Sequence, residues 1–230
     1  ASGNGNNGTA TGAIFSTSSK LGSHAGSWDN IDDRVVIANE ANFDFERTST
    51  FSFSFWIYPN TTPSGDVLFN KENNAALGGY WFNIQATNYY IGVVLRNSST
   101  NRILVVSSGV ITLNAWNHVV ITYTGSSLAS GVSIYINNVL QTNTVSADNL
   151  TATILNNISP SLGARQNGAG WSNFYGGLMD EVGIWNRVLT PNEIARLYNG
   201  GEGIEVVSEL GGIGRYMRGI NRGMLNGGLS

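Results

Sequence analysis

The chain contains no cysteine, so neither disulfide bonds nor thiolate metal sites can stabilise it. Charged residues are also scarce: they make up 12% of the 230 residues, about half the usual share of a soluble domain. The formal net charge of −3 provides no basic surface for a phosphate backbone, so we do not expect nucleic acid as a partner. No apolar run approaches the roughly 20 residues that a membrane-spanning helix requires, so we expect no membrane span.

What the sequence does contain favours β structure. Hydrophobic residues make up 41% and aromatic residues 10%, enough for one buried core. Because so few residues are charged, the surface must be polar and uncharged, and Asn, Ser, Thr and Gly fill that role. This composition suits turn-rich strands and poorly suits long helices. A single all-β domain of this length is common, so one core is the expectation.

Alternating side chains predict the individual strands. In residues 50–57, Phe51, Phe53, Phe55 and Ile57 share one face, and Pro59 follows as a strand terminator. Further strands are predicted at 67–70, 80–85, 90–96, 103–107, 116–124, 158–164 and 177–185. Residues 132–136 and 139–140 form a predicted hairpin, because the Asn-Asn pair between them tolerates the positive φ of a tight turn. This spacing of short strands is typical of a sandwich or barrel.

One short helix is predicted near residues 190–199. Thr190 can cap it, Pro191 suits the first helical position, Glu193 completes a capping box, and Gly200 can close it. We therefore divide the chain into a Gly/Asn-rich arm (1–12), a β domain (13–200) and a Gly-rich tail (201–230).

The tail carries a pattern that suggests assembly. Ile213, Met217, Ile220 and Met224 follow helical spacing, whereas the basic side chains fall on the opposite side, at Arg215, Arg218 and Arg222. Such a segment can dock on a neighbouring subunit.

Residues 28–35 read Trp-Asp-Asn-Ile-Asp-Asp-Arg-Val, and three further segments follow at 51–59, 116–123 and 174–187. In order and spacing, these four resemble the laminin-G-like, concanavalin A-like jelly-roll family. The first is close to that family's Phe-Asp-Gly-x-Asp-Asp-Tyr-Val, and the last runs into the predicted helix as the family pattern does. The resemblance covers about residues 14–200.

The resemblance implies an antiparallel two-sheet β-sandwich with the jelly-roll fold. Its members bind carbohydrate or proteins, mediate adhesion, or serve as shell components, which implies an extracellular or surface-exposed setting such as a secreted protein, a cell surface or a virion. It also implies a structural calcium ion, and the matching positions here are Asp29, Asp32 and Asp180. In the alternative interpretation, Asp180 pairs with an Arg or with backbone N–H groups, and the other acidic residues form a solvated turn.

Sugar binding requires exposed aromatic rings with amide groups nearby. The candidates are Trp171, Tyr175, Asn173, Trp81 and Tyr90, and Trp171 leads because a Gly-rich loop precedes it. Most aromatic residues of a sandwich are in the core, so any one of these is more often buried than in contact with a ligand.

Catalysis has little support. Hydrolases with this fold carry two carboxylates on one strand, facing the same side. Here Asp180 and Glu181 are adjacent, so on a regular strand they point to opposite faces. A structural role for His118 is favoured, because it lies within a predicted strand.

Two classes of function therefore remain. The first is a non-catalytic, lectin-like binding or adhesion module for carbohydrate or a surface glycan. The second is a structural subunit of a virion, filament or shell, a homo-oligomer or larger assembly held by its terminal arms. A free lectin has no use for two long Gly-rich arms, which favours the second, but a link to a neighbouring domain would also explain them. We therefore rank the binding module first and the structural subunit a close second.

Overall fold

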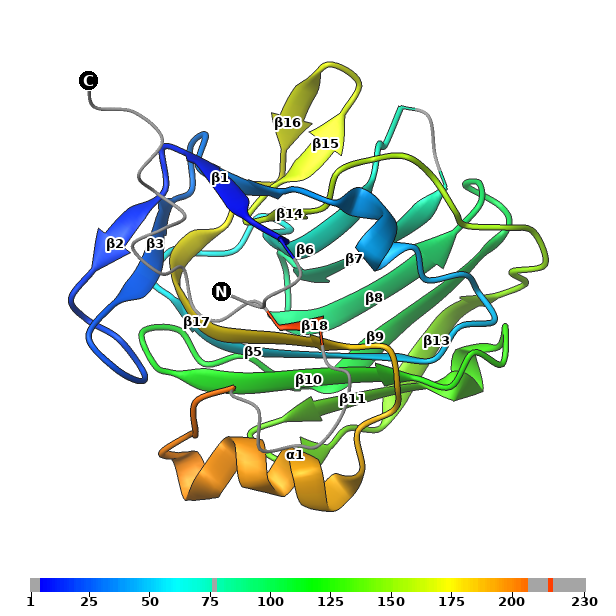
Figure 1. Cartoon of the computed structure of the whole chain (residues 1–230). Coiled ribbons are helices and arrows are strands. Elements are labelled where there is room, and N and C mark those ends of the chain that lie inside the picture. Colours follow the sequence, from blue (N-terminus) through cyan, green and yellow to red (C-terminus); the bar gives the residue numbers. More distant parts are fainter. Residues whose placement is uncertain (1–4, 76–77, 207–214, 217–230) are drawn as a thin grey trace.

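The computed structural model describes residues 5–75, 78–206 and 215–216, which form two antiparallel β-sheets stacked face to face (Figure 1). From edge to edge, sheet A consists of β1 (Gly8–Thr11), β4 (Arg34–Ile37), β14 (Ser161–Leu162), β6 (Val67–Glu72), β7 (Gly79–Ile84), β8 (Tyr90–Arg96), β9 (Arg102–Val110) and β13 (Asn143–Asp148). The chain therefore has the predicted two-sheet sandwich fold.

Sheet B packs against sheet A, and a small hairpin beside sheet A forms a two-stranded sheet of its own (Figure 1). The order in sheet B is β12 (Val139–Leu140), β11 (Val132–Ile136), β10 (Asn117–Tyr123), β5 (Phe51–Pro59), β17 (Gly176–Trp185), β3 (Ala25–Asp29) and β2 (Ile14–Ser16), with β18 (Arg215–Tyr216) paired to β17. The separate hairpin consists of β15 (Arg165–Asn167) and β16 (Gly170–Ser172). Short 3₁₀ turns lie at η1 (Glu40–Phe43), η2 (Ala129–Gly131) and η3 (Asn199–Gly201).

The core lies between the sheets and is rich in aromatic rings. Every second side chain of β5 is completely buried, beginning with Phe51 and Phe53. The ring centroid of Phe53 is 4.7 Å from that of Phe69 on β6 and 4.9 Å from that of Phe82 on β7. The alternating apolar side chains of β5 therefore identify the face of the strand that packs between the two sheets.

The predicted hairpin and helix are both confirmed. The turn between β11 and β12 has φ values of 50° at Asn137 and 64° at Asn138, as a tight two-residue turn requires. Helix α1 (Pro191–Tyr198) begins with a complete capping box between Thr190 and Glu193.

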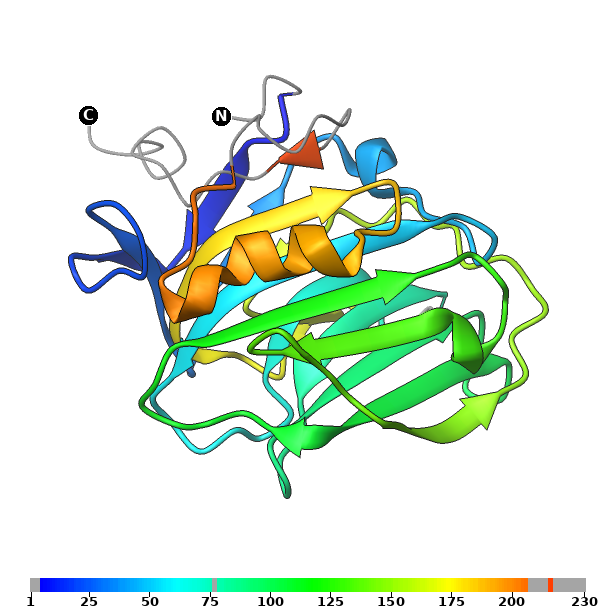
Figure 2. The same ribbon diagram turned by 90° about the horizontal axis from the view of Figure 1, so that it is seen from below.

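Helix α1 lies along the outer face of sheet B (Figure 2). A second apolar cluster fills the contact between them; it consists of Val120, Trp185, Leu189, Ile194, Leu197 and Val206. Ser52 of β5 donates to the Arg187 carbonyl and accepts from the Leu189 amide, which ties the helix approach to the sheet. Since Val206 belongs to this cluster, the folded unit extends past the predicted boundary at residue 200.

The prediction that residues 1–12 form an arm is wrong for residues 8–11. These form β1, the edge strand of sheet A, with Gly8 opposite Ile37. Strand pairing at an edge uses backbone groups and requires no apolar side chains, so composition did not reveal it.

Of the assembly residues, Arg215 lies in β18, opposite Ile184 of β17, rather than in a helix. The others, Met217, Arg218, Ile220, Arg222 and Met224, lie outside the described residues, so the assembly role stays a prediction. None of the described helices is long and apolar enough to cross a membrane.

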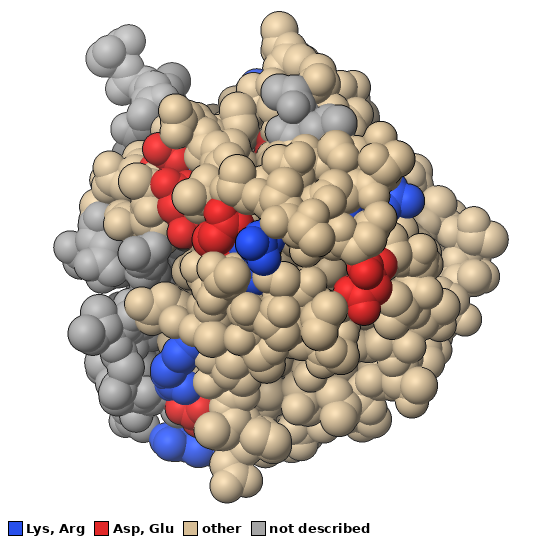
Figure 3. Space-filling view, turned by 90° about the vertical axis from the view of Figure 1, so that its right-hand side faces the viewer, with Lys and Arg blue, Asp and Glu red and all other residues tan. Residues whose placement is uncertain are grey.

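The surface matches the composition. Charged side chains are few on the face shown in Figure 3, and most of the visible surface is uncharged. A local concentration of one charge sign therefore stands out in this protein.

Candidate functional site: a cavity on the outer face of sheet A

A cavity of about 330 Å³ opens on the face of sheet A that points away from sheet B. Its lining comes from four neighbouring strands and the segments beside them: Gly65, Val67, Trp81, Asn83, Gln85, Val94, Arg96, Arg102, Leu104, Arg165 and Asn173. Volumes of this order suit a small ligand or a few sugar units.

Strand alternation positions these side chains. On β7, Tyr80 and Phe82 enter the core, so Trp81 and Asn83 point outward. The neighbouring position on β8, opposite Asn83, is Gly92. A Cβ atom at Gly92 would lie 2.4 Å from Asn83 Oδ1, so the glycine leaves room for the amide against the sheet.

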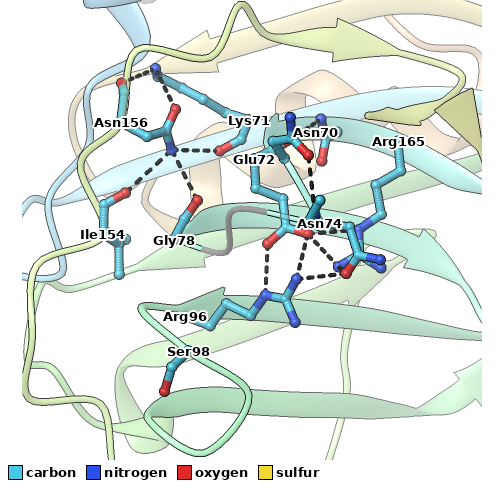
Figure 4. Close-up of polar contacts among 12 residues, drawn as sticks. Asn70, Lys71, Glu72, Asn74, Gly78, Arg96, Ser98, Ile154, Asn156 and Arg165 are labelled. Atoms are coloured by element: carbon cyan, nitrogen blue, oxygen red, sulfur yellow. Dashed lines mark hydrogen bonds and ion pairs between the residues drawn. The ribbon is translucent and has the colours of Figure 1, made fainter. Parts of the chain in front are cut away.

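A buried charged cluster forms one side of the cavity (Figure 4). The Glu72 carboxylate is completely buried between two guanidinium groups. Arg96 Nε donates to Glu72 Oε2 at 2.8 Å, and Arg165 donates to Oε1 through Nε at 2.7 Å and also through Nη2. The Asn74 Oδ1 atom accepts from Nη2 of Arg96 at 2.8 Å and of Arg165 at 2.9 Å.

The Trp81 ring supports both arginines. The guanidinium carbon of Arg165 lies 3.9 Å from the ring centroid, and that of Arg96 lies 4.7 Å from a Trp81 ring centroid. Such contacts stabilise a cation by about 0.5–2 kcal/mol, with the larger values at desolvated sites. Burial lowers the pKa of Arg165, Glu72 raises it, and the neighbouring Arg96 lowers it again. Burial is the largest of these effects, so the pKa of Arg165 lies below its usual value.

Residues 29–195 match a laminin G family model described as the concanavalin A-like lectin/glucanases superfamily. The chain belongs to this family. No curated protein sequence matches it.

Solved structures with low sequence identity share the fold. The binding domain of Paraclostridial Mosquitocidal Protein 1 is 19% identical with a TM-score of 0.66, over 86% of this chain and 48% of that one. Domain 4 of AbnA, an extracellular arabinanase from Geobacillus stearothermophilus solved with arabinotriose, is 16% identical with a TM-score of 0.51, over 84% and 82%. A structure of botulinum neurotoxin type C, a toxin whose cell entry depends on interaction with two ganglioside molecules, is 14% identical with a TM-score of 0.57. The match covers 85% of this chain and 47% of that one. The chain thus spans about half the length of the two toxin chains in these solved structures.

The five sugar-binding candidates predicted from the sequence do not lie at one site: two line the cavity and three do not. Trp81 and Asn173 line the cavity. Trp171 is half-buried on β16 with Arg34 stacked on its ring at 5.0 Å, and Tyr90 is half-buried on β8; neither lines the cavity. Tyr175 is completely buried, and its hydroxyl donates to the Leu178 carbonyl, so its ring offers no surface for a sugar.

Three carboxylates lie close together at the first acidic turn. Two of them, Asp29 and Asp32, are the residues that the family resemblance implies, but the third is Asp33 and not Asp180. One oxygen each from Asp29, Asp32 and Asp33 lies within 4.8 Å of the others. Asp33 Oδ2 accepts from the Asp29 amide at 2.8 Å. Burial raises the pKa of Asp33, and the nearby Asp29 and Asp32 carboxylates raise it further. The turn therefore concentrates negative charge in one place.

Asp180 is not part of that turn. Its Oδ2 accepts from the Lys20 and Leu21 amides, both at 2.9 Å, which is the backbone pairing of the alternative interpretation. Burial raises the pKa of Asp180, and these amides oppose that rise. A β-bulge follows Asp180 and leaves Glu181 with φ of 45°, so the regular alternation assumed from the sequence is interrupted. Glu181 accepts from the Val206 amide, so both carboxylates anchor backbone segments.

His118 is buried beneath helix α1. Its Nε2 lies 2.9 Å from Ser54 Oγ, and its ring centroid lies 4.9 Å from that of Trp56. Burial lowers the pKa of His118 to about 3, so the ring is neutral. The structural role expected for this residue fits its position.

Proposed function

We propose that this domain is a non-catalytic carbohydrate-binding module, acting outside the cell or at a surface, and that the cavity on sheet A is its binding site. The observation that carries the proposal is the lining itself. It combines an indole with the amides of Asn83, Gln85 and Asn173, which suit sugar rings and hydroxyl groups. The AbnA domain solved with arabinotriose supports this class of ligand.

A binding role is favoured over hydrolysis because the cavity lacks the required pair of carboxylates. Glycoside hydrolases use two Asp or Glu side chains beside the scissile bond. None of the described residues lining this cavity is acidic. The carboxylate of the charged cluster, Glu72, is buried and paired with two arginines.

A glycan array tests this proposal with two variants. Asn83→Ala removes an amide from the cavity, and Trp171→Ala removes an aromatic ring outside it. We expect Asn83→Ala to weaken binding about five- to tenfold, the value of one hydrogen bond, and Trp171→Ala to leave it unchanged. Loss with Trp171→Ala alone would move the site to the β15–β16 hairpin, and an empty array for the wild type would reject the lectin function.

We also propose a structural calcium ion at the turn formed by Asp29, Asp32 and Asp33. Calcium takes oxygen ligands at about 2.3–2.6 Å, so oxygens on opposite sides of one ion lie about 5 Å apart, which fits carboxylate oxygens within 4.8 Å. Calcium should raise the melting temperature by several degrees, and Asp32→Asn should abolish that rise. Equal melting temperatures in calcium and in excess chelator would reject the site.

A further inference from the structure

All charged side chains that line the cavity are basic. Arg96, Arg102 and Arg165 line it, and no described Asp or Glu does so. The complete chain has a net charge of −3, so this surface has the opposite sign to the protein as a whole. A cavity lined by one charge sign attracts ligands of the other sign.

The buried cluster leaves positive charge uncompensated. Arg96 and Arg165 share a single carboxylate, that of Glu72, while Asn74 contributes only a neutral amide oxygen. Arg96 is only 6% exposed. Burying a charge without a full counter-charge is costly, so the fold retains here a cation that an anion would stabilise.

A third arginine adds to this charge. Arg102 of β9 lies directly opposite Arg96 of β8 in the strand register. Like charges at directly opposed positions destabilise a sheet. Within residues 5–75 and 78–206, Arg102 forms no ion pair. Local arrangements that cost stability are concentrated at functional sites.

We infer that the cavity selects anionic sugars, with the arginines binding a carboxylate or sulfate group and the Asn83 and Gln85 amides binding hydroxyl groups. This inference rests on the proposed carbohydrate-binding function. A guanidinium group presents paired N–H donors that match the oxygens of a carboxylate or sulfate. The buried Glu72 carboxylate and the partly buried Trp81 ring hold two of the guanidinium groups in place, so little side-chain freedom is lost when the anion binds.

Calorimetric titration with matched probes tests the charge requirement. The carboxylate probe is trigalacturonate, and its control is the fully methyl-esterified trimer, which has the same rings without charge. The sulfate probe is a heparin-derived tetrasaccharide, and its control is the desulfated, N-acetylated form with its carboxylates reduced. We expect at least tenfold tighter binding of a charged probe than of its control, and weaker binding as salt increases.

Two variants with the same change in net charge locate the effect. Arg102→Gln removes a cavity arginine, whereas Arg196→Gln removes one from α1, on the far side of sheet B. We expect Arg102→Gln to weaken the charged probe about tenfold with little change for neutral sugars, and Arg196→Gln to have no effect. Melting curves confirm that both variants fold.

The outcomes separate the two proposals. Equal binding of charged and neutral probes, weakened by Asn83→Ala, would overturn the preference for anions and leave the carbohydrate-binding function standing. Equal losses with Arg102→Gln and Arg196→Gln would show attraction by overall charge alone and overturn the assignment to the cavity. Failure of every charged and neutral probe would overturn both proposals.

Discussion

Replacing His118 with glutamine removes a titratable group that lies beneath helix α1 and is 1% exposed. Glutamine keeps a polar group within reach of Ser54 but cannot take up a proton near neutral pH. In the wild type the imidazole is neutral when folded, because burial lowers its pKa from 6.5 to about 3. The unfolded chain therefore binds a proton that the folded chain rejects.

The sign and size of the effect follow from these two pKa values. The stabilising contribution is complete above pH 6.5 and is lost as the pH falls towards 3, because protonation favours the unfolded chain. Between pH 7 and pH 4.5, the wild type should lose about 2–3 kcal/mol of unfolding free energy through this residue alone.

Urea unfolding of both proteins at several pH values measures this loss. Every other ionisable group is common to both proteins, so the difference between the two curves isolates His118. The wild type should be more stable at pH 7, and its advantage should shrink or reverse by pH 4.5. Parallel curves over this range would refute a neutral, buried imidazole.

Two further substitutions test the interactions described above. Glu72→Gln leaves the Arg96 and Arg165 guanidinium groups beside a neutral amide, so it should lower the unfolding free energy by about 3–5 kcal/mol. An unchanged midpoint of urea unfolding would contradict the ion-pair geometry. Thr190→Ala removes the capping side chain of α1 and should lower the unfolding free energy by about 1 kcal/mol, whereas Thr190→Ser keeps a capping hydroxyl and should retain the wild-type stability. Equal stability of the two variants would show that the cap contributes nothing.

Much of the fold could be predicted from the sequence because its signals are local. Alternation in residues 50–57 identifies β5, two asparagines mark the tight turn, and the Thr190–Glu193 pair marks the start of α1. Strand β1 was missed because its pairing depends on backbone groups alone.

The site was harder to predict because its members come from distant segments. Glu72, Arg96 and Arg165 belong to three different strands, and no local pattern connects them. Trp81 was among the predicted aromatic residues, but so was Tyr175, since a strand sequence alone does not say which aromatic rings the opposite sheet covers. Asp180 matched the family's metal position, yet the Lys20 and Leu21 amides that bind it come from a loop without a recognisable signal.

The position of the binding site is the central claim, and the indole N–H signals of the six tryptophans test it most directly. The ¹⁵N-labelled protein would be titrated with the strongest binder from the array, and Trp81→Phe would assign the cavity signal. We predict that the Trp81 signal shifts in proportion to saturation while that of Trp171 stays in place. A saturable shift at Trp171 with Trp81 unchanged would contradict the account.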